Sequence, residues 1–258
     1  LALSAMTLLL PASVALAVDK CLAVARAPAP PSLIMPARLR LAQLKTGEAR
    51  ISYIGHSTFQ IDAPSGLAIA TDYNDFVRPA RRTDIITMNR AHNTHFTDHP
   101  DPEIRIVLRG WNPDGGAAQH DITLGDVRVR NVPTNIRDYA GGTTVFGNSI
   151  FIFEVGDLCI AHLGHLHHTL TDQQHYQVGQ IDVLLVPVDG SFTMDIDGVI
   201  ETLKLLRAPL IIPMHYFSSW TLDRFLERAR TEFEVRRSPV PTIVVSKDKL
   251  PAKPEILV

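Results

Sequence analysis

Histidines are concentrated in three stretches of this chain, and each stretch follows a run of apolar residues. The stretches are residues 92–99 after the run 84–88, residues 160–169 after the run 149–155, and His215 after the run 210–214. Short apolar runs that end at turn residues are typical of β-strands. Imidazoles delivered from the ends of separate strands are how a fold builds a transition-metal site. The pattern therefore predicts a metal centre rather than three groups of solvated loop histidines.

The overall composition is that of an ordinary globular protein. The 258 residues are 45% hydrophobic and 20% charged, and the formal net charge is −2 at pH 7. This length provides a core for one domain or two. A near-neutral balance without a basic stripe excludes an electrostatic nucleic-acid-binding surface. The expected partner is a small-molecule substrate, and the composition leaves the oligomeric state open.

The amino-terminal 17 residues form an uncharged stretch rich in leucine and alanine. Ala15-Leu16-Ala17 has the small-x-small pattern of a cleavage site, so we expect a signal peptide at residues 1–17. The alternative is an uncleaved anchor, since about 18 apolar residues are enough for a spanning helix. Pro11 and the many alanines favour the signal peptide. It predicts a periplasmic or secreted protein that is not stably inserted in a membrane after processing.

Export would place the two cysteines, Cys21 and Cys159, in an oxidising compartment. They could form one disulfide between the mature amino terminus and the strand before the second histidine stretch. A buried free Cys159 and an unrelated Cys21 are equally compatible with the sequence. Residues 18–46 include a Pro/Ala-rich segment and are predicted to be a leader and linker rather than a packed element.

The period of the apolar residues changes along the chain. Up to residue 155 they alternate in short strands, and the first three, at 50–54, 58–62 and 67–71, are predicted to form an antiparallel meander. Further strands are expected at 84–88, 104–108, 121–124, 126–130, 149–155, 181–188, 210–214 and 242–246. Helices are expected at about 172–178, 195–207 and 222–230. Strands early and β-α alternation late predict one α/β domain at residues 47–250, with two sheets between helical layers.

Four longer motifs lie in order between about residues 50 and 246. They are Ile51-Ser-Tyr-Ile-Gly-His-Ser-Thr-Phe-Gln-Ile61 followed by Thr71-Asp72, Ile160-Ala-His-Leu-Gly-His-Leu166, Val186-Pro-Val-Asp-Gly-Ser-Phe-Thr-Met-Asp195, and Ile212-Pro-Met-His-Tyr216. In order and spacing they resemble metallo-β-lactamase-fold hydrolases of the ascorbate-phosphate-lactonase and phospholipase-D-like branch. The resemblance implies an αββα four-layer sandwich with a metal site at the edge between its two sheets.

The chain departs from that family at its metal-binding motif, His-x-His-x-Asp-His. Aligned without gaps, the motif falls on Arg90-Ala-His92-Asn-Thr94-His95, so arginine replaces the first histidine and threonine replaces the aspartate. A one-residue insertion would instead align Asp98 and His99 with the end of the motif. We prefer the ungapped alignment because it keeps the distance from the preceding strand.

Two further family ligands are also replaced. The histidine expected near residues 132–136 is absent, and the metal-bridging aspartate is His165. The resemblance then implies about one metal ion, held by His95, His165 and His215, with His92 as a fourth ligand or a neighbour. Three neutral imidazoles and a water make a tetrahedral Zn²⁺ set, with iron or manganese as alternatives. The bound water should ionise near pH ~7, whereas a site closed by His92 would be structural rather than catalytic.

Other residues are candidates for catalysis. Asp189 follows a strand where the family has glycine, and it is a candidate ligand or general base, or else a turn residue. Asp98 could orient a water or an imidazole, or cap the following segment. His167 and His168 are expected to flank the mouth of the site, and one of them, for which we take His168, could contact substrate or protonate a leaving group. His56 follows the family's Gly-His pattern and is expected near the site without binding metal.

The sequence therefore predicts a hydrolase that uses a metal-activated water on a small ester, lactone or phosphodiester. The alternative is a catalytically degenerate member of the same fold that binds metal or ligand without turnover. The number of open coordination positions distinguishes the two.

Overall fold

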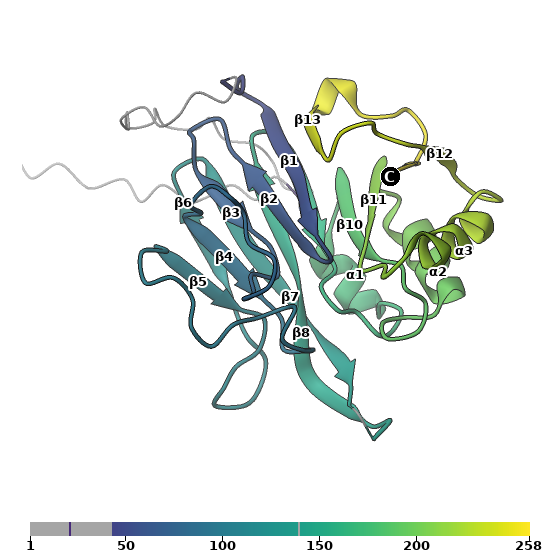
Figure 1. The fold of residues 1–258 in the computed structure, drawn as a ribbon, viewed down its shortest axis with the longest axis horizontal. Coiled ribbons are helices and arrows are strands. Elements are labelled where there is room, and N and C mark those ends of the chain that lie inside the picture. Colours follow the sequence, from purple (N-terminus) through teal and green to yellow (C-terminus); the bar gives the residue numbers. More distant parts are fainter. Residues whose placement is uncertain (1–20, 22–42, 139) are drawn as a thin grey trace, which may run out of the picture.

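The computed structural model describes Cys21, residues 43–138 and residues 140–258. The expected signal peptide and nearly all of the expected leader lie outside the described residues. Within the described residues the chain forms two β-sheets and three α-helices (Figure 1).

The first sheet has the strand order β13-β1-β2-β3-β4-β5. Its strands are β1 (Glu48–Gly55), β2 (Thr58–Asp62), β3 (Ala68–Ala70), β4 (Ile85–Met88), β5 (Ile106–Arg109) and β13 (Thr242–Ser246). β1, β2 and β3 pair antiparallel, which confirms the predicted meander, and β3, β4 and β5 pair parallel. Because parallel strands end at the same edge of a sheet, the loops after β3 and β4 lie at one edge.

The second sheet has the order β12-β14-β11-β10-β9-β8-β7-β6. Its strands are β6 (Asp121–Leu124), β7 (Val127–Arg137), β8 (Thr143–Val155), β9 (Leu158–His162), β10 (Val183–Pro187), β11 (Leu210–Met214), β12 (Glu234–Arg236) and β14 (Glu255–Leu257). β6 to β9 pair antiparallel, while β9, β10 and β11 pair parallel. The loops after β9, β10 and β11 therefore leave the sheet at one edge.

Two strands of the second sheet are not predicted from the sequence. β12 and β14 have three residues each, which is too short to show an alternating pattern. β14 pairs with β11 and extends the sheet beyond residue 250, where the domain was expected to end. The β7–β8 hairpin is also longer than the expected strands 126–130 and 149–155.

The helices α1 (Asp172–Val178), α2 (Ile196–Leu206) and α3 (Ser219–Ala229) share one core cluster with the second sheet. Each begins at a side-chain cap, formed by Thr171, Asp195 and Ser218 respectively. A separate apolar cluster, which includes the fully buried Phe59 and Phe153, fills the space between the sheets. Two sheets with few helices fit the expected αββα sandwich. No helix of the described ranges is long and apolar enough to span a membrane.

The outer face of the first sheet is covered differently. The residues packed there against Ile86 and Met88 include Phe96 and Trp111, and these two belong to loops. Both lie in the loops that follow β4 and β5. The loop after β4 therefore contributes to the core at the same time as it carries the first histidine stretch.

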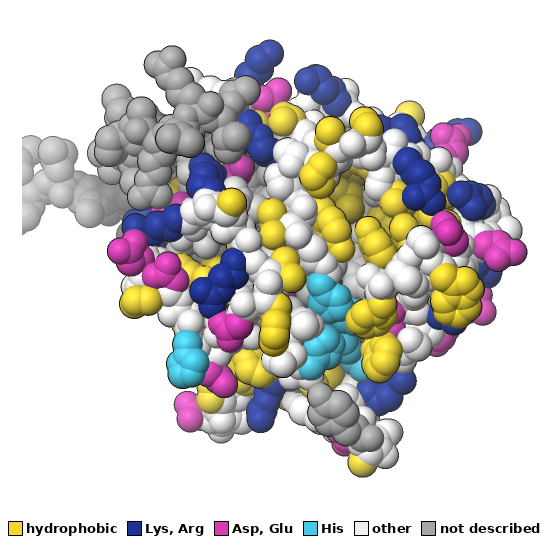
Figure 2. Space-filling model, in the orientation of Figure 1, with side chains coloured by type: hydrophobic (Ala, Val, Ile, Leu, Met, Phe, Trp, Pro, Cys, Tyr) yellow, Lys and Arg dark blue, Asp and Glu magenta, His cyan; other side chains and the backbone are white. Residues whose placement is uncertain are grey.

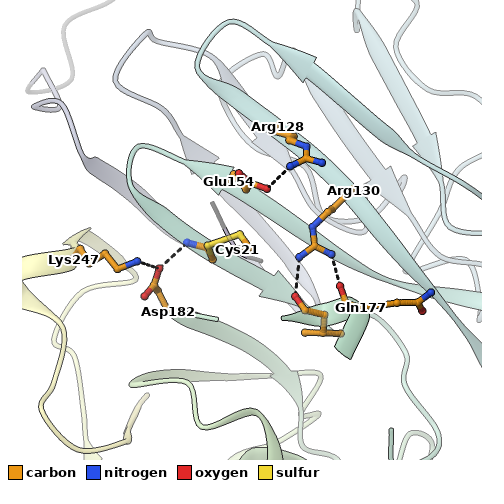
Figure 3. Close-up of a disulfide and its surroundings, with 9 residues drawn as sticks. Cys21, Arg128, Arg130, Glu154, Gln177, Asp182 and Lys247 are labelled. Carbon is orange, nitrogen blue, oxygen red and sulfur yellow. Dashed lines mark hydrogen bonds and ion pairs between the residues drawn. A yellow bond between two sulfur atoms is a disulfide. The ribbon is translucent and has the colours of Figure 1, made fainter. Parts of the chain in front are cut away.

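The structure joins the two cysteines in a disulfide, which the sequence left open (Figure 3). The Cα atoms of Cys21 and Cys159 lie 5.7 Å apart, and the two residues are 138 positions apart in the sequence. The backbone N–H of Gln180 donates to the Cys21 carbonyl at 3.0 Å. The backbone N–H of Cys159 donates to Asp182, which also pairs with Lys247 at 3.4 Å. Cys21 is thus held covalently and by hydrogen bonding at the start of β9.

Candidate metal centre

Histidines from separate loops meet at the edge of the sandwich where several strands end. They are His56 between β1 and β2, His92 and His95 after β4, His165 after β9, and His215 after β11. One ligand atom from each of His56, His92, His95 and His215 lies within 4.8 Å of the others. The His165 ring centre is 4.7 Å from that of His215. The structure thus brings together the four residues predicted as ligands, and histidines gather on this face in Figure 2.

The Nε2 atoms of four imidazoles face one another in two pairs. Nε2 of His95 lies 3.1 Å from Nε2 of His215. Nε2 of His92 lies 3.2 Å from Nε2 of His165. Tetrahedral coordination at about 2.0–2.1 Å per bond places two nitrogens ~3.3 Å apart. The observed spacing within each pair is therefore that of two ligands of one metal ion.

His95 is fully buried, and its other ring nitrogen is held by a carboxylate. Nδ1 lies 2.5 Å from Oδ2 of Asp72 and 3.2 Å from the Ser57 hydroxyl. Asp72 accepts a further hydrogen bond from the Asn89 amide at 3.0 Å. Burial raises the pKa of the Asp72 carboxyl, and the hydrogen bonds from Asn89 and Ser57 and the nearby His162 and His215 oppose this rise. An ionised Asp72 fixes the proton of His95 on Nδ1 and leaves the Nε2 lone pair for a ligand bond.

His215 is held in the same way by Asp189. Its Nδ1 lies 3.1 Å from Oδ1 of Asp189. The carboxylate also accepts backbone N–H groups of Ser191, Phe192 and Thr193 and the Thr193 hydroxyl. Burial alone would raise the pKa of Asp189, but the hydrogen bonds from His215 and Thr193 lower it below its usual range. Asp189 is therefore ionised and holds the His215 imidazole in position through this hydrogen bond.

The other two imidazoles have neutral partners. Nδ1 of His92 lies 2.8 Å from the Thr94 hydroxyl, and Nδ1 of His165 lies 2.6 Å from Nε2 of His167. His92 is only half-buried, whereas His165 is 4% exposed. The centre thus combines two imidazoles whose Nδ1 atoms are held by carboxylates with two whose Nδ1 atoms are held by neutral groups.

Gly164 allows the loop after β9 to deliver His165. Its φ is +61°, a region that L side chains rarely adopt. A Cβ at this position would lie 2.3 Å from Oδ1 of Asn148 and 2.4 Å from Nδ2 of Asn89. Asn148 accepts the backbone N–H of His165 at 2.8 Å, so the close approach at Gly164 is part of how His165 is positioned.

The protonation states favour a cation at the centre. Burial lowers the pKa of His92, and lowers the pKa of His95 and His165 well below 6.5. Burial also lowers the pKa of His56 to about 4, and its Nε2 is buried without a hydrogen-bond partner among the described residues. Neutral imidazoles whose Nδ1 atoms are occupied present lone pairs to one another. This donor set fits Zn²⁺ or a similar borderline metal ion.

The structure places the predicted catalytic residues in different surroundings. Asp98 and His99 are exposed, so the gapped alignment brings no ligand into this cluster. His168 accepts the backbone N–H of Asn135 at Nε2 and contacts the Thr169 carbonyl through Nδ1 at 2.8 Å. Both of its ring nitrogens are therefore engaged by backbone groups. Asp189 does reach the cluster, as a partner of His215.

Two residues of the site were not assigned a role from the sequence. Asp72 was noted only as part of the Thr-Asp turn of the resemblance, although its position after β3 places it at the same edge as His95. His167 was grouped with His168, because adjacent histidines in a loop give no indication of which one faces the histidine cluster. The direction of a side chain after a strand depends on loop geometry, which has no simple period.

Comparison with known proteins shows the family to which the chain belongs. Residues 50–215 match the β-lactamase superfamily domain. The chain is 28% identical over 220 residues to a UPF0173 metal-dependent hydrolase of Nanoarchaeum equitans, covering 78% of this chain and 98% of that protein. It is 35% identical over 202 residues to one of Thermoplasma volcanium, covering 66% and 84%. A solved structure from Thermotoga maritima, a candidate Zn-dependent hydrolase of the metallo-β-lactamase superfamily, shares 27% identity with a TM-score of 0.58 and covers 81% of this chain and 97% of that chain.

The chain therefore belongs to the β-lactamase superfamily, which confirms the metallo-β-lactamase fold suggested by the four motifs. Within that superfamily it is a metal-dependent hydrolase with a histidine-rich site.

Proposed function

We propose that this protein is an exported hydrolase that holds one Zn²⁺ ion and directs water to a small ester, lactone or phosphodiester. The observation that carries the proposal is that four imidazoles turn their Nε2 atoms toward one another while all of their Nδ1 atoms are engaged by other groups. In this proposal His95, His165 and His215 hold the ion, and His92 is a fourth ligand that can leave. Iron or manganese could replace zinc in such a set.

The number of metal ions follows from the residues that would be ligands. Thr94 stands where the family has an aspartate, and its hydroxyl is engaged by His92. His165 stands where the family has a bridging carboxylate, and its Nδ1 is engaged by His167. Neither residue therefore presents a free atom to a second ion, so we expect about one equivalent per chain.

Hydrolysis of an ester would proceed as follows. A bound metal ion would supply Lewis acidity and lower the pKa of a water. The water oxygen bonds to the acyl carbon as the bond from that carbon to the alcohol oxygen breaks, and one water proton ends on the alcohol. Asp72 and Asp189 keep His95 and His215 oriented during this change. His56 lies in the same cluster, and its buried Nε2 has no hydrogen-bond partner among the described residues.

Metal analysis combined with a substrate screen tests this function. Purified protein, dialysed without chelator, is expected to contain about one equivalent of zinc and to hydrolyse some of a set of carboxylic esters, lactones and phosphodiesters. Activity should disappear with a chelator and return with Zn²⁺. Two equivalents of tightly held metal would contradict the single-ion proposal.

A closed four-histidine site is the second candidate, because the 3.2 Å between Nε2 of His92 and Nε2 of His165 is the spacing of two ligands of one ion. Four permanent imidazole ligands leave no open position, and such sites are structural. The substitution His92→Ala separates the two proposals. If the site is catalytic, the variant keeps its zinc and its turnover within about tenfold. If the site is closed, the wild type binds zinc without turnover, and His92→Ala opens a position.

Export is proposed from the sequence of residues 1–17, and the disulfide between Cys21 and Cys159 supports an oxidising compartment. Intact-mass measurement of protein from a periplasmic or culture fraction tests it. Cleavage after Ala17 is expected, whereas a chain that keeps these residues and fractionates with membranes would contradict it.

A further inference from the structure

An apolar pocket of about 260 Å³ opens between the edges of the two sheets. Its walls come from β1, β2 and β13 of the first sheet and from β11 and β14 of the second, together with the loop that precedes β13. The apolar residues that line it include Ile51, Phe59, Ile212, Pro213 and Ile243. None of the residues in the described lining is charged, and none is histidine.

Two tyrosines place this pocket directly beside the histidine cluster. Tyr53 and Tyr216 both line the pocket, and their rings stack with centres 6.2 Å apart. Tyr216 follows His215 in the sequence, and the Tyr53 hydroxyl donates to the His56 carbonyl at 3.4 Å. The same carbonyl accepts the backbone N–H of His215 at 2.9 Å. The tyrosine pair therefore lies where the pocket borders the cluster, and Figure 2 shows hydrophobic side chains around a hollow next to the histidines.

We propose that this pocket binds the alkyl or aryl group of a neutral ester whose scissile bond lies at the histidine cluster. The inference rests on the proposed hydrolase function and specifies its substrate class. The volume is slightly below the roughly 300 Å³ at which small-molecule pockets begin, so it accommodates one arm of a substrate rather than a whole molecule. An ionised arm would lose its hydration without gaining a charged partner in this lining, so the arm is uncharged. An apolar arm gains affinity from burial alone.

Blocking the pocket without disturbing the core is feasible at Val240. This residue lines the pocket yet is 54% exposed, so a larger side chain can be placed there from the solvent side. Val244 is a matched control, because it is 46% exposed on the neighbouring strand β13 and does not line the pocket. The test compares Val240→Trp with Val244→Trp, and Val240→Asp with Val244→Asp in case tryptophan impairs folding. Far-UV circular dichroism and the unfolding midpoint verify that each variant is folded.

The first measurement needs no turnover. Titration with N-phenyl-1-naphthylamine, a neutral apolar fluorophore, is expected to show saturable binding to the wild type, with and without metal. Both Val240 variants should weaken this binding at least tenfold, and both Val244 variants should leave it within twofold. Equal effects at the two positions would overturn the inference.

The second measurement uses p-nitrophenyl esters from acetate to octanoate. Burying each added methylene should raise kcat/KM about fourfold until the pocket is full. Val240→Trp should flatten the series, whereas Val244→Trp should keep the rise with chain length. A wild-type series that is flat, or that is identical in Val240→Trp, would overturn the pocket while leaving the hydrolase proposal intact. Fluorophore binding that is lost only in the Val240 variants, combined with no turnover of these esters, of lactones or of phosphodiesters, would support the pocket and overturn the hydrolase.

Discussion

Strand β9 joins two regions of the molecule that are held together in different ways. At its start, Cys159 is bonded to Cys21, and its backbone N–H is satisfied by Asp182. Beyond its end, His165 faces His92 with the two Nε2 atoms 3.2 Å apart. The first region is held by a disulfide and a hydrogen bond within the polypeptide. In the second region imidazole lone pairs face one another, and a bound cation would join them. Stability and metal binding should therefore respond to different substitutions.

The largest effect on metal binding is expected from His215→Ala. The change removes one Nε2 ligand and leaves the buried Asp189 without its imidazole partner. Loss of an outer partner of a ligand typically weakens metal binding 10- to 100-fold, and loss of the ligand itself should exceed that range. Competition with a chromophoric chelator measures the affinity for zinc. His99→Ala is the control, because His99 is exposed, and an equal loss in that variant would mean that the cluster described above is not the metal site.

At the other end of β9, Cys21→Ser should lower the free energy of unfolding by about 2–5 kcal/mol. The disulfide joins residues 138 positions apart, so its removal frees a long loop in the unfolded chain. Urea denaturation measures the change, and the zinc content should stay at the wild-type value. Reduction of the wild type should reproduce the effect and add nothing to the variant. A parallel loss of zinc would show that the two regions are not separable.

The sequence predicts the positions of the strands well where apolar runs are long enough to show a period. It also predicts which loops carry the site, because the end of a strand can be located from the sequence without knowledge of tertiary packing. The strands β12 and β14 are too short for such a signal, and the covering of the first sheet by Phe96 and Trp111 depends on tertiary contacts.

Within the site, the sequence indicates the residue types but not their roles. His95 and His215 are recognisable from motifs, yet their carboxylate partners lie far away in the sequence, 23 residues away for His95 and 26 residues away for His215. Asp98 is much closer to His95 in sequence and is nevertheless exposed. Proximity along the chain is thus a poor guide to which acid orients a ligand, because strand crossovers decide which loops meet.

Asp189→Asn tests the hydrogen bond between the Asp189 carboxylate and His215, and an intermediate effect on zinc affinity is expected. Asparagine keeps the size of the side chain and one carbonyl oxygen, but it lacks the negative charge that favours the Nδ1–H tautomer. Zinc affinity should fall about 10- to 100-fold, with less effect on folding than His215→Ala. Asp197→Asn is the control, because Asp197 lies on the surface of α2 in an ion pair with Arg228. Wild-type affinity in Asp189→Asn would reduce Asp189 to a turn residue, which was one of the roles left open by the sequence.

The smallest effect is expected from Thr94→Val, which removes the hydroxyl beside Nδ1 of His92 at nearly constant side-chain size. A neutral hydrogen bond contributes about 0.5–1.5 kcal/mol, so zinc affinity should fall less than about tenfold. Thr169→Val, at an exposed position, serves as the control. The comparison with Asp189→Asn matters more than either value. Both variants keep all four imidazoles, and they differ in which imidazole has its Nδ1 partner changed. An effect of Thr94→Val as large as that of Asp189→Asn would mean that His92 is as tightly bound as His215. The ion would then have four permanent ligands, and the closed, structural site would become the better description.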